Sequence, residues 1–133
     1  MRIGIIGAGL AGAFLGDQLS KLGHETRVYE KSRGVGGRLA TRRGDGVQFD
    51  HGAPYITART EPFQSLLQAH GLSVAVWAPK VTTLAPQKKR YKRDWFEPHF
   101  VGTPKMGALC ASLLKNCDVR FQRDAFSGCN PMT

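Results

Sequence analysis

A strand, a glycine cluster and a helix follow one another at the start of the chain, and they constrain the fold more than any other feature. The apolar run RIGII (2–6) predicts a buried strand and leads directly into the glycine cluster at 7–12. Apolar residues then recur at helical spacing from Leu10 to Leu22, and Gly23 stands where a C-terminal cap belongs. The segment TRVYE (26–30) predicts a second strand that ends in a carboxylate. This order predicts a βαβ unit.

The glycines of this unit follow the pattern G-x-G-x-x-G, in Gly7-Ala8-Gly9-Leu10-Ala11-Gly12. Within a βαβ unit that spacing is typical of dinucleotide-binding proteins, so the predicted fold class is α/β with a Rossmann-like FAD/NAD(P)-binding domain. Gly7 would allow the sharp turn, Gly9 would let a pyrophosphate approach bare backbone, and Gly12 would let the helix pack on the strand. Leu10 and Ala11 open the helix, where unpaired N–H groups favour phosphate. A glycine-rich turn that binds no ligand is the alternative.

Glu30 and the loop that follows it bear on the identity of the dinucleotide. Glu30 can accept hydrogen bonds from both ribose hydroxyls and disfavours a ribose 2′-phosphate, although Lys31 and Arg33 could offset that repulsion and leave NADP open. The loop continues with Gly36-Gly37-Arg38, which adds backbone donors and a planar cation beside the same pyrophosphate. A plain nicotinamide-binding domain has no need of this second glycine loop. The element therefore argues against an NADP-dependent dehydrogenase.

Two segments resemble those of a known family. EKSRGVGGRLATRR (30–43) and FDHGAPYITAR (49–59) are similar to the hallmark segments of renalase-like, FAD-dependent amine-oxidase-type flavoproteins, which share a glutathione-reductase-type FAD-binding domain. FVGTPKMGALCASLL (100–114) matches that group less sharply. The resemblance covers residues 2–121, and it is most specific in the first half.

The resemblance implies FAD as the cofactor and implies which residues hold it. The adenosine end would lie on Gly7–Gly12, Glu30 and Lys31, and Gly36, Gly37 and Arg38 would lie beside the pyrophosphate and flavin. The turn at 52–55 would lie against the isoalloxazine, through Gly52, Ala53, Pro54 and Tyr55. Proline stands at 54 where the family usually has glutamine, and it supplies neither an N–H nor a side-chain donor. The implied reaction passes a hydride from a small-molecule substrate, an amine or a reduced nicotinamide, to flavin.

Family members are substantially longer, which shapes the expected domain organisation. Residues 1–57 and 100–121 are expected to form the FAD-binding core, 58–99 the start of a substrate-domain-like insertion, and 122–133 a divergent or disordered tail. The domain would be incomplete relative to the family. A second chain could then supply the missing domain, or the chain could be a non-catalytic nucleotide-binding fragment, so whether it is an enzyme alone stays open.

Local patterns predict the remaining elements. Helices are expected from Thr60 to Gly71 and over 104–115, the second with Thr103 as its cap and Pro104 in its first turn. Residues 31–46 are expected to be an irregular connection and 87–102 a hairpin or irregular strand pair. Strands are predicted over 46–50, 72–77, 81–84 and 118–121.

Charge and cysteine content bound the other function classes. The formal charge of +9 suits an anionic partner, and the basic-aromatic segment 88–93 raises a nucleic-acid-binding protein as a further alternative. No recognition helix accompanies that segment, so a solvated hairpin face is favoured. Three cysteines without metal-ligand spacing predict no metal site and a reducing cytoplasm. No apolar run reaches the ~18 residues of a membrane span. No catalytic residue is identified.

Overall fold

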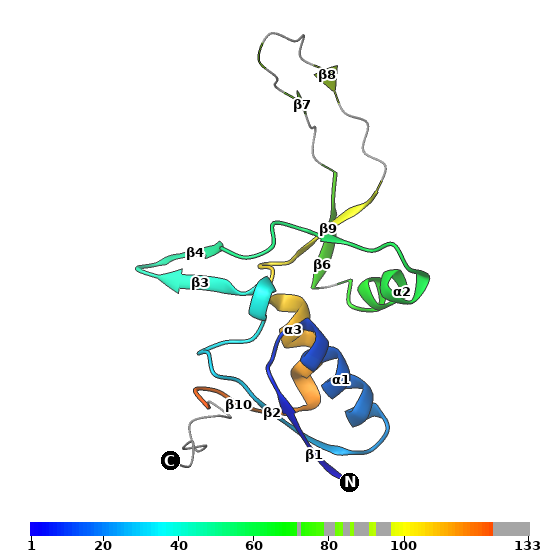
Figure 1. Ribbon diagram of the computed structural model, residues 1–133, viewed down its shortest axis with the longest axis vertical. Helices are drawn as coiled ribbons and strands as arrows, with labels where there is room; N and C mark the ends of the chain where they lie inside the picture. The colour runs from blue at the N-terminus through cyan, green and yellow to red at the C-terminus, as the bar shows by residue number, and fades with distance from the viewer. Residues whose placement is uncertain (72, 79–81, 84–85, 87–90, 93–96, 124–133) are drawn as a thin grey trace, which may run out of the picture.

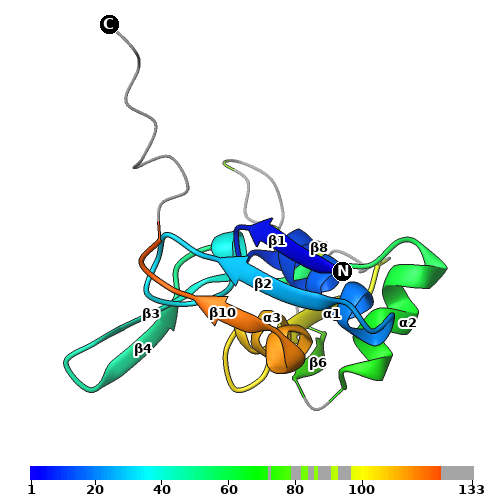
Figure 2. The same cartoon turned by 90° about the horizontal axis from the view of Figure 1, so that it is seen from below.

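The computed structural model describes residues 1–71, 73–78, 82–83, 86, 91–92 and 97–123 (Figure 1). A parallel sheet in the order β1–β2–β10 lies at its base, formed by Arg2–Ile6, Glu25–Tyr29 and Asp118–Arg120. Helix α1 (Leu10–Lys21) connects the first two strands, while α3 (Ala108–Leu113) and the 3-10 helix η2 (Leu114–Asn116) lead into the third. Figure 2 shows both helices on one face of this sheet. The predicted βαβ unit and α/β class are confirmed.

Strand β2 has the alternation that a half-covered strand requires. Thr26 and Val28 are buried beneath the helices, whereas Glu25 and Arg27 are exposed. The strand pairs in parallel with β1 on one side and with β10 on the other, with Val28 opposite both Ile5 and Val119. These apolar side chains form the part of the core that supports the glycine turn.

Helix α1 lies where its periodicity predicts, but its fully buried residues are Ala13, Gly16 and Asp17, none of which is a large apolar residue. Ala13 and Gly16 are buried, while Phe14 and Leu15 are 42% and 48% exposed. A Cβ on Gly16 would lie 3.0 Å from the Cys117 sulfur, so the helix approaches its neighbours more closely than a larger side chain would permit. Of the apolar residues whose spacing predicted the helix, Leu10 and Leu19 pack against the core.

A second, antiparallel sheet has the order β5–β9–β6, formed by Ile56–Thr57, His99–Gly102 and Val74–Trp77. Helix α2 (Glu61–Ala69) follows β5, close to the predicted range. Strands β7 (Thr82–Thr83) and β8 (Tyr91–Lys92) pair antiparallel. The sheet joins strands from both sides of the expected insertion at 58–99, whose boundaries stay a prediction. The basic segment 88–93 and the tail at 122–133 lie largely outside the described residues.

The expected irregular connection at 31–46 contains two elements that were not predicted. A 3-10 helix, η1 (Gly37–Leu39), follows the glycine pair, and β3 (Thr41–Gly44) pairs with β4 (Val47–Asp50) in a hairpin. Asp45 and Gly46 connect the strands with φ angles of 46° and 77°, as a type I′ turn requires. Figure 1 shows the hairpin projecting from the body of the protein.

The third helix begins later than its apparent capping residues predicted. It starts at Ala108 with Gly107 as its N-cap, so Thr103 and Pro104 do not open it. A Cβ on Gly102 would lie 2.3 Å from the carbonyl oxygen of Lys105, which shows how tightly the chain folds back here. The predicted buried face of the helix is confirmed, because Met106, Leu109, Cys110, Leu113 and Leu114 all lie in the core.

Candidate cofactor site

The two glycine loops lie against each other at the carboxyl end of the parallel strands. The Gly36 N–H donates to the Ala8 carbonyl at 2.9 Å, and Gly9 and Gly36 form a parallel bridge. At the end of β1, the Gly7 N–H donates a hydrogen bond to the Tyr29 carbonyl at 2.8 Å. Leu10 and Ala11 then open α1. Motifs that are distant in sequence thus form one backbone surface, as the predicted site requires.

Several glycines are required by the fold itself. Gly7 has a φ of 95°, which disfavours any residue with a Cβ. A Cβ on Gly12 would lie 2.0 Å from the Gly7 carbonyl oxygen. Gly37, with a φ of 54°, would place a Cβ 3.3 Å from the Gly9 Cα. These glycines therefore serve the turn and the contact between the two loops.

Gly9 differs from these residues, because a Cβ there would meet no protein atom closer than 3.9 Å. Its φ of −76° is also open to ordinary residues. Nothing within the folded chain requires glycine at this position. The bare backbone at Gly9 fits a ligand that approaches the start of α1, as a dinucleotide pyrophosphate does.

The Glu30 carboxylate ties the first glycine loop to the loop that follows β2. It is 7% exposed and accepts hydrogen bonds from the N–H groups of Ala8, at 2.7 Å, and Ser32, at 2.8 Å. Burial opposes its charge, but these bonds and the Lys31 ammonium outweigh it and hold the pKa of Glu30 below its usual value. A carboxylate has about four acceptor positions, so it retains capacity for the predicted ribose contact.

Backbone contacts extend the site from the second glycine loop to the turn at 52–55. The Ala53 N–H donates to the Arg38 carbonyl at 2.8 Å, and a Cβ on Gly52 would lie 2.1 Å from that oxygen. Arg38 is exposed, as is Pro54. The centroids of the Tyr55 and His99 rings lie 4.0 Å apart, so Tyr55 contacts the second sheet. The predicted loops thus come together, with Tyr55 at the boundary of the second sheet.

Asp50 connects two segments beside the candidate site, and the sequence analysis missed this contact. Its carboxylate accepts hydrogen bonds from the Thr41 hydroxyl and from the Met106 N–H, whose two distances are 3.1 and 3.2 Å. It therefore joins the hairpin that precedes the 52–55 turn to the segment before α3. The available signal was an acidic residue at the end of a strand, beside a predicted ligand turn.

The sequence analysis expected neither a metal site nor a membrane span, and the described part of the chain bears on both expectations. There, no group of three or more histidine, cysteine, aspartate or glutamate side chains is placed to hold a metal ion. In the same residues no helix is both long enough and apolar enough to cross a membrane.

Known proteins share this arrangement. Residues 5–70 match the family model of an NAD(P)-binding Rossmann-like domain. A 4,4′-diapophytoene desaturase from Staphylococcus aureus is 35% identical over 71 residues, which are 53% of this chain and 14% of the desaturase. A Pyrococcus furiosus protein of known structure aligns with a TM-score of 0.52 and 35% identity, over 68% of this chain and 24% of that one.

A putrescine oxidase variant with redesigned cofactor binding also aligns, with a TM-score of 0.52 and 25% identity. That match covers 71% of this chain and 21% of the oxidase. The chain thus spans less than a quarter of each of these three proteins. The range 5–70 matched by the family model contains the glycine turn, helix α1 and strand β2.

Proposed function

We propose that this chain, whose residues 5–70 match an NAD(P)-binding Rossmann-like domain, is the FAD-binding part of a flavin-dependent oxidoreductase of the amine oxidase superfamily. Its similarity to a desaturase and to a putrescine oxidase supports this proposal. The bare backbone at Gly9, which the fold does not itself require, is the observation that carries this proposal. Resemblance of segments 30–43 and 49–59 supports the renalase-like, amine-oxidase-type branch. Bound FAD would supply hydride-accepting chemistry, with an amine or a reduced nicotinamide as donor.

The chain's own residues would bind and orient the cofactor. The N-terminus of α1 offers its backbone N–H groups to the pyrophosphate, and Gly9 allows close approach. The exposed Arg38 guanidinium adds a cation with a planar fork of donors. Glu30 is fixed by Ala8 and Ser32 with room for the ribose hydroxyls, and its charge disfavours a 2′-phosphate. Ala53 and Gly52 fix the turn on which the flavin end would rest.

Flavin retention by matched glycine variants tests this proposal. The purified chain is incubated with FAD and desalted, and its visible spectrum and thermal unfolding are recorded. Gly9→Ala should lose most of the flavin and keep its melting temperature, because its Cβ fits the protein and obstructs the ligand. Gly34→Ala is the matched control, since a Cβ there meets nothing within 4 Å, and it should change neither property. Arg38→Ala should weaken FAD binding about tenfold through loss of a charge-assisted bond.

Gly12→Ala completes the series as a fold-breaking comparison, since it should unfold at a lower temperature through the clash with Gly7. A folded wild-type chain that stays colourless, or a Gly9→Ala variant that retains flavin as the wild type does, would contradict the proposal.

A partner chain that completes the domain is a second element of the proposal. Exposed apolar side chains favour it, since Ile6 and Val76 are 68% and 67% exposed and Trp77 is 41% exposed. On this proposal, coexpression with the chain that supplies the substrate domain should yield a complex of defined stoichiometry in size-exclusion chromatography. Ile6→Ser and Val76→Ser should weaken that complex without unfolding the chain.

A further inference from the structure

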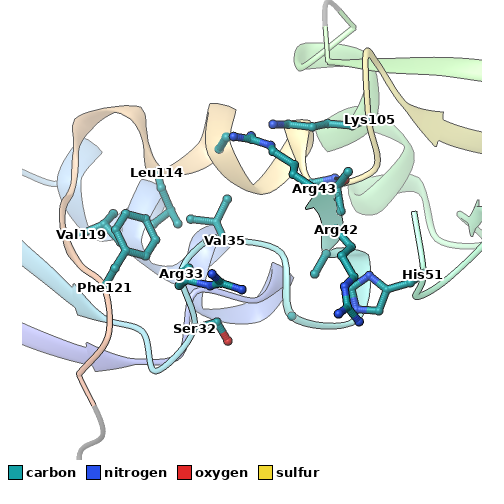
Figure 3. Close-up of a pocket in the computed structure, with 16 residues that line it drawn as sticks. Ser32, Arg33, Val35, Arg42, Arg43, His51, Lys105, Leu114, Val119 and Phe121 are labelled. Atoms are coloured by element: carbon teal, nitrogen blue, oxygen red, sulfur yellow. Dashed lines mark hydrogen bonds between the residues drawn. The ribbon is translucent and has the colours of Figure 1, made fainter. Parts of the chain in front are cut away.

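A basic recess lies where the β3–β4 hairpin meets the segment before α3. It is one end of a groove of about 860 Å³, and Arg42, Arg43 and Lys105 line it. Figure 3 shows the charged ends of Arg43 and Lys105 turned the same way, over α3. Arg42 lies beside His51 in the same view, and Arg33 lies apart from all of these residues. The cations of the recess therefore come from the hairpin and from the segment before α3, and not from the loop after β2.

The positive charge of the recess is not neutralised within the described part of the chain. The salt bridges found there join other residues, and none of them engages Arg42, Arg43 or Lys105. None of the residues that line the groove carries a carboxylate. Like charges on one wall of a groove repel one another, and a bound anion relieves that repulsion.

The fold holds the elements that carry Arg43 and Lys105 together. The Asp50 carboxylate accepts hydrogen bonds from the Thr41 hydroxyl and from the Met106 N–H, the latter with distances of 3.1 and 3.2 Å. Arg43 follows Thr41 by two residues, on the same face of β3, and Lys105 directly precedes Met106. The two cations are thus placed before any ligand binds, which lowers the ordering cost of binding.

The lining beside these cations suits an anionic segment of a protein better than a nucleic acid. Ala40 and Gly107 line the groove next to Thr41 and Met106, and their small size leaves space for an incoming side chain. The Phe121 ring, on which a nucleic-acid base would stack, lies at the opposite end of the groove (Figure 3). The net charge of +9 disfavours a second copy of this chain as the occupant. Charge complementarity favours an acidic segment of a different protein.

We propose that the basic recess is a docking site for an acidic peptide segment of a partner protein. One carboxylate of that segment lies between Arg43 and Lys105, and a neighbouring carboxylate pairs with the planar guanidinium of Arg42. The site goes beyond the proposed FAD function and does not depend on it, because no contact of the recess involves the backbone at Gly9.

Fluorescence anisotropy of a labelled, end-capped hexaglutamate peptide, titrated with the full chain, tests the site. The wild type should bind the peptide with one-to-one stoichiometry. Arg43→Gln/Lys105→Gln should weaken binding about tenfold. The matched control is Arg2→Gln/Lys115→Gln, which removes the same charge from exposed residues outside the groove lining and should change binding less than about twofold.

Asp50→Ala separates a placed pair of cations from net charge. The variant is one unit more positive, so net charge alone would tighten peptide binding. On this proposal it weakens binding about threefold, because the hairpin and the segment that carries Lys105 are no longer joined. Tighter binding in Asp50→Ala, or equal losses in the two charge-neutralising variants, would overturn the site.

Two further arms identify the source of the anion. A single-stranded oligothymidylate of the same charge should bind more weakly than the peptide, and tighter binding through Arg43 and Lys105 would assign the recess to nucleic acid. Saturating FAD should leave peptide binding unchanged, and displacement of the peptide would make the recess part of the cofactor site. Flavin retention is measured separately, so a colourless chain that still binds the peptide would contradict the proposed function alone.

Discussion

Gly9 and Gly12 lie one turn apart, yet a methyl group at each would meet opposite surroundings. At Gly12 it would overlap the Gly7 carbonyl, whereas at Gly9 it would lie in ordinary contact distance of the second glycine loop. The G-x-G-x-x-G pattern therefore combines residues needed for folding with a residue left for the ligand. The motif predicted these separate uses, and the surroundings of Gly9 and Gly12 agree with that prediction.

Glu30 gives the site a dependence on pH. Because hydrogen bonding depresses its pKa in the folded chain, its contribution to stability is present above the ordinary value of 4.5 and is lost as the pH falls through the lower folded value. Glu30→Gln should lower the free energy of unfolding by about 1–3 kcal/mol at pH 7. That difference should shrink toward pH 3.

Urea unfolding of both proteins between pH 7 and pH 3 measures this dependence. Glu25→Gln, an exposed carboxylate at the start of the same strand, is the matched control and should show little effect at either pH. A Glu30→Gln deficit of equal size across the whole range would rule out the ionised carboxylate as its cause.

At the scale of elements, Asp50 connects the hairpin to the segment that precedes α3. Asp50→Ala should destabilise the chain by about 1 kcal/mol, because the Met106 N–H loses its acceptor. The stability of Asp50→Asn should lie between those of the wild type and Asp50→Ala, since its one amide oxygen can still accept a hydrogen bond. Hydrogen exchange at the Met106 amide should accelerate in the alanine variant. Unchanged exchange there would show that the carboxylate does not hold this segment.

Sequence-based prediction succeeded for the βαβ unit and failed for the start of α3. The βαβ unit was predictable because the glycine spacing, the strand patterns and Glu30 lie within 30 consecutive residues. The start of α3 was not, because Thr103 and Pro104 have the chemistry of a helix start. The chain there instead follows the fold-back at Gly102 and the bond from Met106 to Asp50, which lies 56 positions earlier. Tertiary contacts of this kind override local capping preference.

The candidate site shows the same division. Its two glycine loops could be predicted from their residues, and their direct contact through Gly9 and Gly36 agrees with that prediction. The contact of Asp50 with Met106 could not be predicted, because it depends on how the hairpin and the segment before α3 are placed.

For the whole molecule, Cys110 offers a probe of global opening. It is fully buried, and burial raises the pKa of its thiol to about 11, so it should resist alkylation at pH 8. In a urea series, iodoacetamide labelling of Cys110 should rise with the same midpoint as the loss of circular dichroism. Saturating FAD should move both midpoints to higher urea, because FAD at a hundredfold excess over Kd raises the free energy of unfolding by about 2.7 kcal/mol.

Peptide mass spectrometry separates Cys110 from the half-buried Cys117 in that experiment. Rapid labelling of Cys110 while the circular dichroism signal is intact would mean that α3 opens independently of the rest of the core.

The projecting hairpin offers a position at which the protein can be labelled or tagged. Its turn, at Asp45 and Gly46, is exposed, and none of the contacts described for the glycine loops passes through it. A fluorophore or an affinity tag inserted there would leave the backbone around Gly9 undisturbed. The protein could thus be immobilised or followed one molecule at a time through the hairpin, with the candidate cofactor site left open.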